Sequence, residues 1–235
     1  MKNVPPEYVG VWCRSGIWRS NGSSDLSTKV WWFQSSRYHI DLRIPADRPS
    51  VASAAALAQL APEQLARFAA QTGFAGVTVV EGERCEWRPA IAFPATSADL
   101  DAGWMRFDDA DHIHETGLDK SYEEDWYREP AGPMHGVRLE EVNGNAIAYL
   151  LISEHWMAWA CGRPGDAFLA AAPSQLACSE FTVYRRDGQW TAIASNFGWR
   201  EGQSLALSLE QALQWQPGEV IELPMVHSVP WRVAV

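Results

Sequence analysis

The chain of 235 residues has few cysteines and no long apolar segment. Its longest apolar stretch, residues 51–61, is mostly alanine, so it is too short and too weakly hydrophobic to span a bilayer. No apolar run follows Lys2, so we expect no secretory signal. The cysteines form no CxxC pair, which excludes the usual zinc and redox motifs; they are Cys13, Cys85, Cys161 and Cys178. We expect reduced, mostly buried thiols in a cytoplasmic protein.

Basic side chains are scarce as well. Lys and Arg total 19 against 29 Asp and Glu, which gives a formal net charge of −10, and no basic run occurs. Such a chain is a poor candidate for binding nucleic acid or an anionic membrane surface. The sequence contains no GxSxG nucleophile elbow, no P-loop and no GxGxxG ahead of a helix, so nothing in it points to a cofactor.

Tryptophan is the abundant residue, with 13 in the chain. The rest of the composition, 47% hydrophobic and 20% charged, is that of an ordinary globular protein. An indole is first a large core filler, and it also offers a stacking surface to a ligand. The sequence leaves both uses open.

Short runs of aromatic and β-branched residues, separated by turn residues, predict roughly fifteen strands at the spacing of antiparallel barrels or sandwiches. Residues 78–93 and 182–197 are each a strand, a tight turn and a strand that carries a tryptophan. They indicate a weak internal repeat or a chance similarity between two hairpins. We predict a mainly β protein of two antiparallel barrel units, residues 1–132 and 133–235, joined at Pro130–Pro133.

Helices are predicted at two places. Within residues 50–72, Ser50 is the expected N-cap, Pro62 suits the first turn of a second helix, and Gly73 is a natural C-terminal cap. Residues 205–215 form the other predicted helix. Both segments are short, so the strands dominate the predicted fold.

The first predicted strand carries Gly10-Val11-Trp12, which resembles the Gly-x-Trp signature of lipocalin-like (calycin) barrels. In such barrels the tryptophan closes one end and often stacks under an arginine of the last strand. The resemblance implies that Trp12 and Arg232 close the first barrel in this way.

A longer set of motifs resembles the bacterial relatives of the fungal Hri-one protein family. The resemblance covers residues 8–130 by motif and the second half by general pattern. It implies two units of lipocalin topology and carries no established activity. The motifs, in chain order, are Trp32-Phe-Gln34, Asp41 to Pro49, Gly73-Phe-Ala-Gly76, Glu86-Trp87, Glu115-Thr-Gly117 and Tyr122-x-Glu124-x-Trp126-x-Arg128.

Strand alternation predicts a polar patch inside the first barrel. The even positions from Tyr122 to Arg128 share one face, and the other face is mostly acidic and therefore exposed. Glu115 shares an inward face with Ile113 on the preceding predicted strand. The candidate ligand-binding side chains are Arg43, Trp32, Trp87, Glu115, Glu124, Trp126 and Arg128, with Asp41 beside Arg43.

Two interpretations of this patch remain open. It can be a binding site walled by the three tryptophans, or a closed network of ion pairs that sets strand register, since small barrels often fill their interiors. Buried charges must be paired in either case.

The pair His112 and His114 falls on one strand face and suggests a metal site. Glu115 points the opposite way, so no third ligand is evident and we expect no metal.

The sequence therefore favours a non-enzymatic β-barrel protein that binds a small, partly apolar ligand or a protein partner. The alternative is an isomerase or hydrolase that uses Glu115 and Glu124 as its carboxylate pair. An open pocket with those carboxylates at its wall is what an enzyme needs. The sequence does not indicate the oligomeric state.

Overall fold

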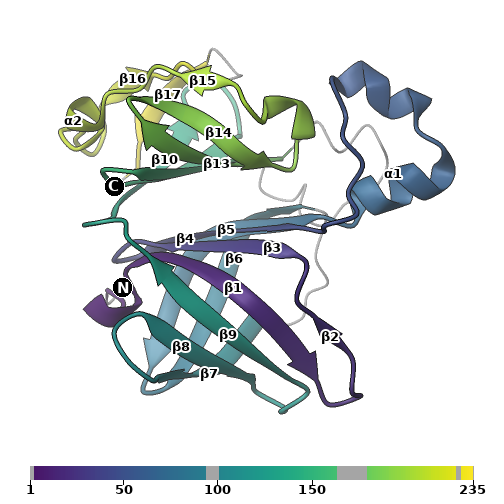
Figure 1. Ribbon diagram of the computed structural model, residues 1–235. Coiled ribbons are helices and arrows are strands. Elements are labelled where there is room, and N and C mark those ends of the chain that lie inside the picture. Colours follow the sequence, from purple (N-terminus) through teal and green to yellow (C-terminus); the bar gives the residue numbers. More distant parts are fainter. Residues whose placement is uncertain (1–2, 94–100, 163–178, 226–228, 235) are drawn as a thin grey trace.

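Two antiparallel β-sheets, packed against each other, make up the computed structural model (Figure 1). The structure describes residues 3–93, 101–162, 179–225 and 229–234. Sheet A uses the chain up to residue 129, and sheet B begins at residue 135. The change of sheet therefore falls at the predicted linker, Pro130–Pro133.

Sheet A is a closed barrel. From β3 to β9 the strands follow one another in chain order, β3 pairs with β1, and β9 returns to pair with β1 over eight residue pairs. β1 and β3–β9 therefore form an eight-stranded antiparallel barrel, and the short β2 pairs with β1 beside it. This confirms a mainly β, barrel-containing fold. The strands are β1 (Gly10–Arg19), β2 (Ser24–Asp25), β3 (Lys29–Gln34), β4 (Tyr38–Ile44), β5 (Thr72–Glu81), β6 (Arg84–Phe93), β7 (Asp101–Phe107), β8 (His112–Gly117) and β9 (Tyr122–Glu129).

Sheet B is open. Its end strands are β15 and β16, and no pairing joins these two in the described part of the chain. The predicted second closed barrel is therefore not found, because β15 and β16 contribute only two and three residues and leave a gap between them. The strands are β10 (His135–Glu141), β11 (Ile147–Ile152), β12 (Trp156–Gly162), β13 (Glu180–Asp187), β14 (Gln189–Ser195), β15 (Ser204–Leu205), β16 (Val220–Glu222) and β17 (Pro230–Val233).

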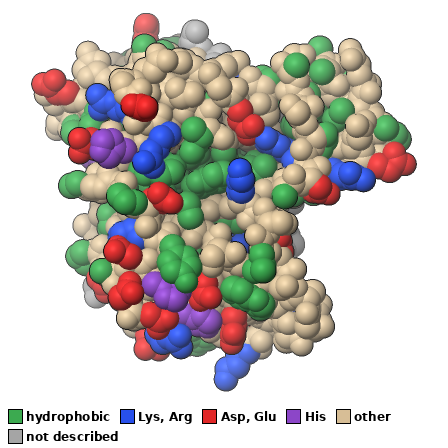
Figure 2. Space-filling model, in the orientation of Figure 1, with side chains coloured by type: hydrophobic (Ala, Val, Ile, Leu, Met, Phe, Trp, Pro, Cys, Tyr) green, Lys and Arg blue, Asp and Glu red, His purple; other side chains and the backbone are tan. Residues whose placement is uncertain are grey.

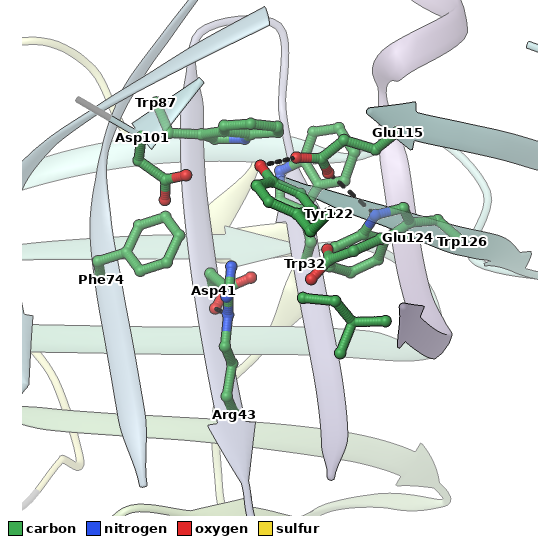
Figure 3. Close-up of a pocket in the computed structure, with 11 residues that line it drawn as sticks. Trp32, Asp41, Arg43, Phe74, Trp87, Asp101, Glu115, Tyr122, Glu124 and Trp126 are labelled. Atoms are coloured by element: carbon green, nitrogen blue, oxygen red, sulfur yellow. Dashed lines mark hydrogen bonds and ion pairs between the residues drawn. The ribbon is translucent and has the colours of Figure 1, made fainter. Parts of the chain in front are cut away.

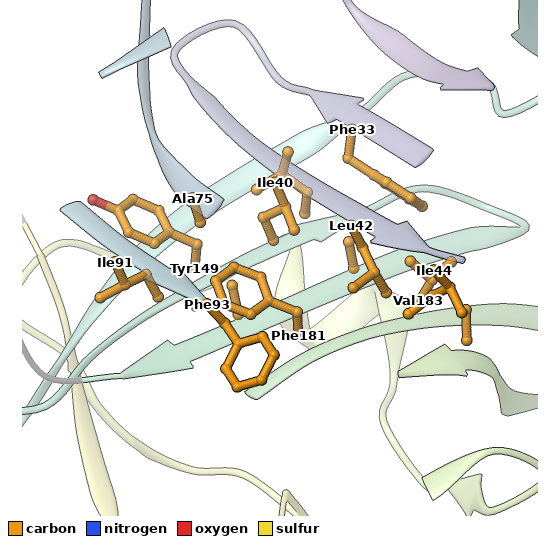
Figure 4. Packing of buried hydrophobic residues seen from close by; sticks show 14 of the residues in the cluster. Phe33, Ile40, Leu42, Ile44, Ala75, Ile91, Phe93, Tyr149, Phe181 and Val183 are labelled. Carbon is orange, nitrogen blue, oxygen red and sulfur yellow. The ribbon is translucent and has the colours of Figure 1, made fainter. Parts of the chain in front are cut away.

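The largest apolar core lies between the sheets, where one flank of the barrel packs on sheet B (Figure 4). Strand alternation produces it: on β4, Ile40 and Leu42 face sheet B, whereas Asp41 faces the barrel interior. On β11, Tyr149 faces the barrel and Leu150 faces a second core on the far side of sheet B. A third cluster, rich in tryptophan, fills part of the barrel.

The helices are shorter than predicted. Residues Ala54–Gln59 form a 3₁₀ helix, and its N-cap is Ser53, whose hydroxyl accepts a hydrogen bond from the Ala56 N–H. The prediction of Ser50 as the cap is therefore wrong. The helix α1 (Pro62–Ala69) begins at Pro62 as predicted and buries Phe68.

Two further helix predictions are corrected. Gly73 does not cap α1, since it lies within β5 opposite Leu42. Of residues 205–215, only α2 (Leu209–Ala212) is α-helical. Leu205, where the predicted helix begins, belongs to β15 instead. The described ranges contain two more 3₁₀ helices, at Pro6–Tyr8 and Gly198–Arg200.

None of the helices in the described ranges is long and apolar enough to cross a membrane. Cys13 is a half-buried free thiol, and Cys85 is a buried one. Cys161 is buried in sheet B. Cys178 lies outside the described residues.

Candidate functional site

One end of the barrel is closed by Trp12 and Arg128. The Trp12 side chain is fully buried, and its Nε1 donates to the Tyr8 carbonyl oxygen at 2.9 Å. The Arg128 guanidinium lies over the indole, 4.1 Å from the ring centroid, and donates to the carbonyl oxygens of Glu7, Val9 and Ala110. A cation over an aromatic face is stabilising, so the contact of Arg128 with Trp12 stabilises the closed end of the barrel. We call these two side chains the plug.

The predicted partner of Trp12 was Arg232, and that prediction is wrong. Arg232 lies exposed on β17 of sheet B, opposite Glu140 and Val220. The strand that closes the barrel is β9, which places Arg128 directly opposite Trp12. The last strand of the barrel is not the last strand of the chain.

A cavity of about 130 Å³ lies toward the other end of the barrel (Figure 3). Ile17 lies at this end of β1, and the partly exposed Arg43 side chain, 30% accessible, reaches solvent where β4 ends. Six of the seven predicted ligand-binding side chains meet here. The lining residues are Ile17, Trp32, Asp41, Arg43, Phe74, Trp87, Asp101, Glu115, Tyr122, Glu124 and Trp126.

The pairing of β8 with β9 brings two carboxylates together. Glu115 lies directly opposite Glu124 in this pair, and both are buried with 3% exposure. Inward space for Glu115 comes from Gly103 on the neighbouring strand, where an added Cβ would lie 2.7 Å from the Glu115 Oε1. Gly117 makes room for the Tyr122 ring in the same way. Alternation and two glycines thus create the polar wall predicted from the sequence.

Two arginines compensate two of the carboxylates. The Arg14 Nη1 lies 2.5 Å from the Glu124 Oε1, and the Arg43 Nε lies 2.8 Å from the Asp41 Oδ1. Arg128 was predicted to take part in this patch, and that prediction is wrong, because its guanidinium is held over Trp12 at the other end of the barrel. The ion pair of Arg14 and Glu124 joins β1 to β9, whereas Arg43 and Asp41 both lie on β4. Loss of one partner of a buried ion pair is costly, so the first of these pairs stabilises the contact between its two strands.

The Glu115 carboxyl is held by two neutral donors. The Tyr122 hydroxyl donates to its Oε1 at 2.8 Å, and the Trp126 Nε1 donates to its Oε2 at 3.1 Å. Burial, followed by the charge of Glu124, raises the pKa of Glu115 to about 8. Near neutral pH, Glu115 therefore carries a proton for much of the time while no cation is beside it.

Two other cavity carboxyls also titrate above their ordinary range. Burial raises the pKa of Asp41 to about 6, although the charge of Arg43 opposes this. Burial likewise raises the pKa of Asp101, again against Arg43. The cavity therefore disfavours the ionised form of these carboxyl groups.

Aromatic rings form the remaining walls. The centroids of Trp32 and Trp87 are 5.4 Å apart with the rings nearly perpendicular, at 82°. Trp126 meets Trp32 in a similar edge contact, at 5.8 Å and 74°. The tryptophans of the cavity therefore pack on one another and also bound the space in which the carboxylates meet.

Sequence reasoning missed five participants. Asp101, the first residue of β7, was not among the candidates, and Tyr122 was placed on the inward face without a role. Arg14 lies two residues after Trp12, so alternation alone could have placed it on the inward face. Its contact with Glu124 could not be predicted, because a bulge after Arg14 shifts the register of β1 against β9. The lining residues Ile17 and Phe74 carried no polar signal.

The two candidate metal-binding histidines lie outside the barrel. The His114 Nδ1 lies 2.8 Å from the Asp125 Oδ1, and the His112 ring stacks on Tyr127 at 4.5 Å. In Figure 2, histidine side chains lie among acidic side chains on the lower part of the molecule, which is the barrel. No group of three or more His, Cys, Asp or Glu side chains in the described residues is arranged to hold a metal ion.

A wider groove, of about 990 Å³, lies on sheet B beside α2 and β16. Its apolar lining includes Leu207, Trp215 and Ile221, and Glu219 and Glu222 contribute carboxylates. It coincides with the gap between β15 and β16. It contains none of the predicted site residues.

No protein-family model matches the chain, and no curated protein matches it by sequence. Among solved structures, the chain is similar to the crystal structure of an uncharacterised protein from Saccharomyces cerevisiae, YLR301w. The TM-score is 0.59 at 13% sequence identity, and the match covers 95% of this chain and 96% of the yeast chain. The two proteins therefore share a fold along almost their whole length.

Proposed function

We propose that the barrel binds a small ligand in the cavity between Trp32 and Glu115, and that the protein is not an enzyme. The observation that carries this proposal is the asymmetry of the barrel. One end is plugged by Trp12 and Arg128, whereas the other keeps a cavity with convergent charged groups. A barrel that served only as a scaffold would fill both ends with side chains.

The volume limits the size of the ligand. An engineered cavity of about 150 Å³ in another protein admits benzene, so the 130 Å³ here suits a molecule of about that size or smaller. Drug-sized ligands need roughly 300–1,000 Å³. A molecule with one charged or polar end and a short apolar body would fit both kinds of wall.

The test is native mass spectrometry of protein purified from its own host. Wild-type protein should carry an excess mass that is lost on denaturation. Ile17→Phe, which adds bulk to the cavity wall, should lose the excess mass, and Ile193→Phe on the exposed face of sheet B is the matched control. Two results together would overturn the proposal. The wild type would carry no retained ligand, and no molecule of a small-fragment library would shift the NMR signals of the indole N–H groups in the cavity.

One observation favours the enzymatic alternative, an isomerase or hydrolase. The environments of Glu115 and Glu124 differ: burial raises the pKa of Glu115 to about 8, while Glu124 has Arg14 beside it. Unequal carboxyls can act as acid and base. Incubation with the retained molecule distinguishes the two functions. A binding protein leaves the molecule chemically unchanged, whereas an enzyme converts it. In the second case Glu115→Gln should abolish turnover.

We also propose that the barrel is of the calycin type and that the chain is a relative of the fungal Hri-one family. The up-and-down strand order and the stacking of Arg128 on the tryptophan of Gly10-Val11-Trp12 support the first part. The motifs along residues 8–130 support the second.

A further inference from the structure

The cavity holds more carboxylates than cations. Two of its four carboxyl groups, Asp41 and Glu124, are paired with arginines. Glu115 and Asp101 make no ion pair within the described part of the chain. An unpaired buried carboxylate is costly, so the folded cavity favours an occupant that supplies positive charge.

Within the described residues, Asp101 is the cavity carboxyl whose oxygens accept no hydrogen bond. Both oxygens of Glu115 already accept hydrogen bonds, from Tyr122 and Trp126. Asp101 makes no hydrogen bond to another residue of the described ranges, and its carboxyl group is directed into the cavity, between Phe74 and Trp87 (Figure 3). A ligand donor in the cavity would therefore meet Asp101 without displacing an existing bond.

The aromatic walls discriminate in the same direction. The faces of Trp, Tyr and Phe rings carry negative potential and attract cations, and aromatic boxes recognise ammonium groups. Trp87 and Trp126 stand nearly perpendicular to Trp32, so the rings bound the cavity from more than one side. An anion would face four carboxyl groups, and a neutral apolar molecule would leave Glu115 and Asp101 without an ion-pair partner.

We infer that the ligand is a small alkylammonium ion, whose nitrogen lies between Asp101 and Glu115 and whose alkyl group packs on Trp32 and Trp87. This inference rests on the proposed function, because it names the chemical class of the molecule bound in the same cavity. Arg43, at the solvent side, forms its ion pair with Asp41; its charge also favours the ionised forms of Asp101 and Glu115, but it makes no ion pair with either.

Binding should release a proton from Glu115. The titratable or charged groups around the cavity with it are Tyr122 and Glu124 on β9, Asp101 on β7, Cys85 on β6, and Asp41 and Arg43 on β4. Burial raises the pKa of Glu115 to about 8 and that of Asp41 to about 6, so Glu115 is the group that ionises toward pH 8. A cation favours the ionised carboxyl, so affinity should rise as the pH increases toward 8 and then level off.

The test uses three probes of one shape and different charge: n-butylammonium, 1-butanol and butyrate. Binding is followed by NMR from the shifts of the indole N–H signals of the full chain. We expect n-butylammonium to bind about tenfold or more tightly than 1-butanol, and butyrate to give no shift. Asp101→Asn should weaken n-butylammonium binding about tenfold, and Asp108→Asn, on the exposed side just after β7, is the matched control.

The outcomes separate this inference from the proposed function. If 1-butanol or butyrate binds best and Ile17→Phe abolishes that binding, the cavity is a binding site and the cationic ligand class is wrong. If no probe binds at any pH, the inference fails together with its premise. Equal affinity for n-butylammonium in Asp101→Asn and wild type, or an affinity that falls as pH rises from about 6 to 8, also overturns the inference.

Discussion

Arg128 is a residue whose role follows from its position opposite Trp12. Its guanidinium covers the indole and holds three backbone carbonyls around the end of the barrel. The close approach needs Gly10, since a Cβ there would lie 2.7 Å from the Arg128 Nη1. Gly10 and Trp12 therefore act together: the glycine admits the arginine, and the indole receives it.

Arg128→Ala should lower the free energy of unfolding by about 2–4 kcal/mol, because it removes a cation–π contact and hydrogen bonds from a charged donor. Urea denaturation measures the change. Arg232→Ala, at the exposed position that was predicted to fill this role, should stay within about 0.5 kcal/mol of the wild type. Equal losses in the two variants would contradict the plug.

At the scale of elements, the two sheets meet closely because β5 carries a glycine at the contact. A Cβ at Gly73 would lie 2.8 Å from the Phe181 Cγ. Phe181 on β13 is fully buried in the shared core and occupies the space that Gly73 leaves open. Gly73 was predicted to end a helix, and its function in the structure is instead to let sheet B approach the barrel.

Gly73→Ala should therefore destabilise the protein by about 1–3 kcal/mol through overpacking against Phe181. Phe181→Leu should also destabilise it, by roughly 1 kcal/mol. The double variant should lose less than the sum of the two, since the smaller side chain makes room for the new methyl group. Strictly additive losses in a double-mutant cycle would show that the two residues do not share this contact.

The whole molecule is held together by the core between its sheets. Barrel residues such as Phe33 and Leu42 share one buried cluster with Leu151 and Val183 of sheet B. Separation of residues 1–132 from the rest would expose the barrel half of that cluster to water, at about 25 cal/mol for each Å² of apolar surface.

Residues 1–132 expressed alone should accordingly be less stable than the full chain and should bind a hydrophobic dye such as ANS. Thermal melts and dye fluorescence of both proteins provide the comparison. A fragment that melts at the temperature of the full chain and binds no dye would mean that the barrel is an independent unit.

The buried carboxyls make the stability of the molecule depend on pH. The pKa of Glu115 is raised to about 8 in the folded protein, against about 4.3 when unfolded. Its contribution to stability is fully present below about pH 4.3 and is lost as the pH rises through 8, with a slope of up to about 1.4 kcal/mol per pH unit. Asp41 also makes the free energy of unfolding decrease as the pH rises, but at lower pH, since its pKa in the folded protein is about 6.

Urea denaturation at several values between about pH 6.5 and 8 should show the free energy of unfolding decreasing with pH in the wild type. Glu115→Gln keeps the shape of the side chain and cannot ionise, so its decrease should be shallower. Parallel curves for the two proteins would exclude Glu115 as the titrating group.

Local sequence patterns were enough to predict most of the strands and the faces that they present. The predicted strands that carry Glu115 and Glu124 are β8 and β9, and Glu115, Glu124 and Trp126 point into the barrel as alternation requires. These features depend on local patterns with a period of two residues, which are legible in one chain.

Only the tertiary structure decided which strand closes the barrel and whether each sheet closes at all. Arg128 rather than Arg232 covers Trp12 because β9 pairs with β1, and sheet B stays open between β15 and β16. Arg14 reaches Glu124 from 110 positions away along the chain. Such contacts depend on long-range pairing and on single bulges that shift register, and neither leaves a periodic trace in the sequence.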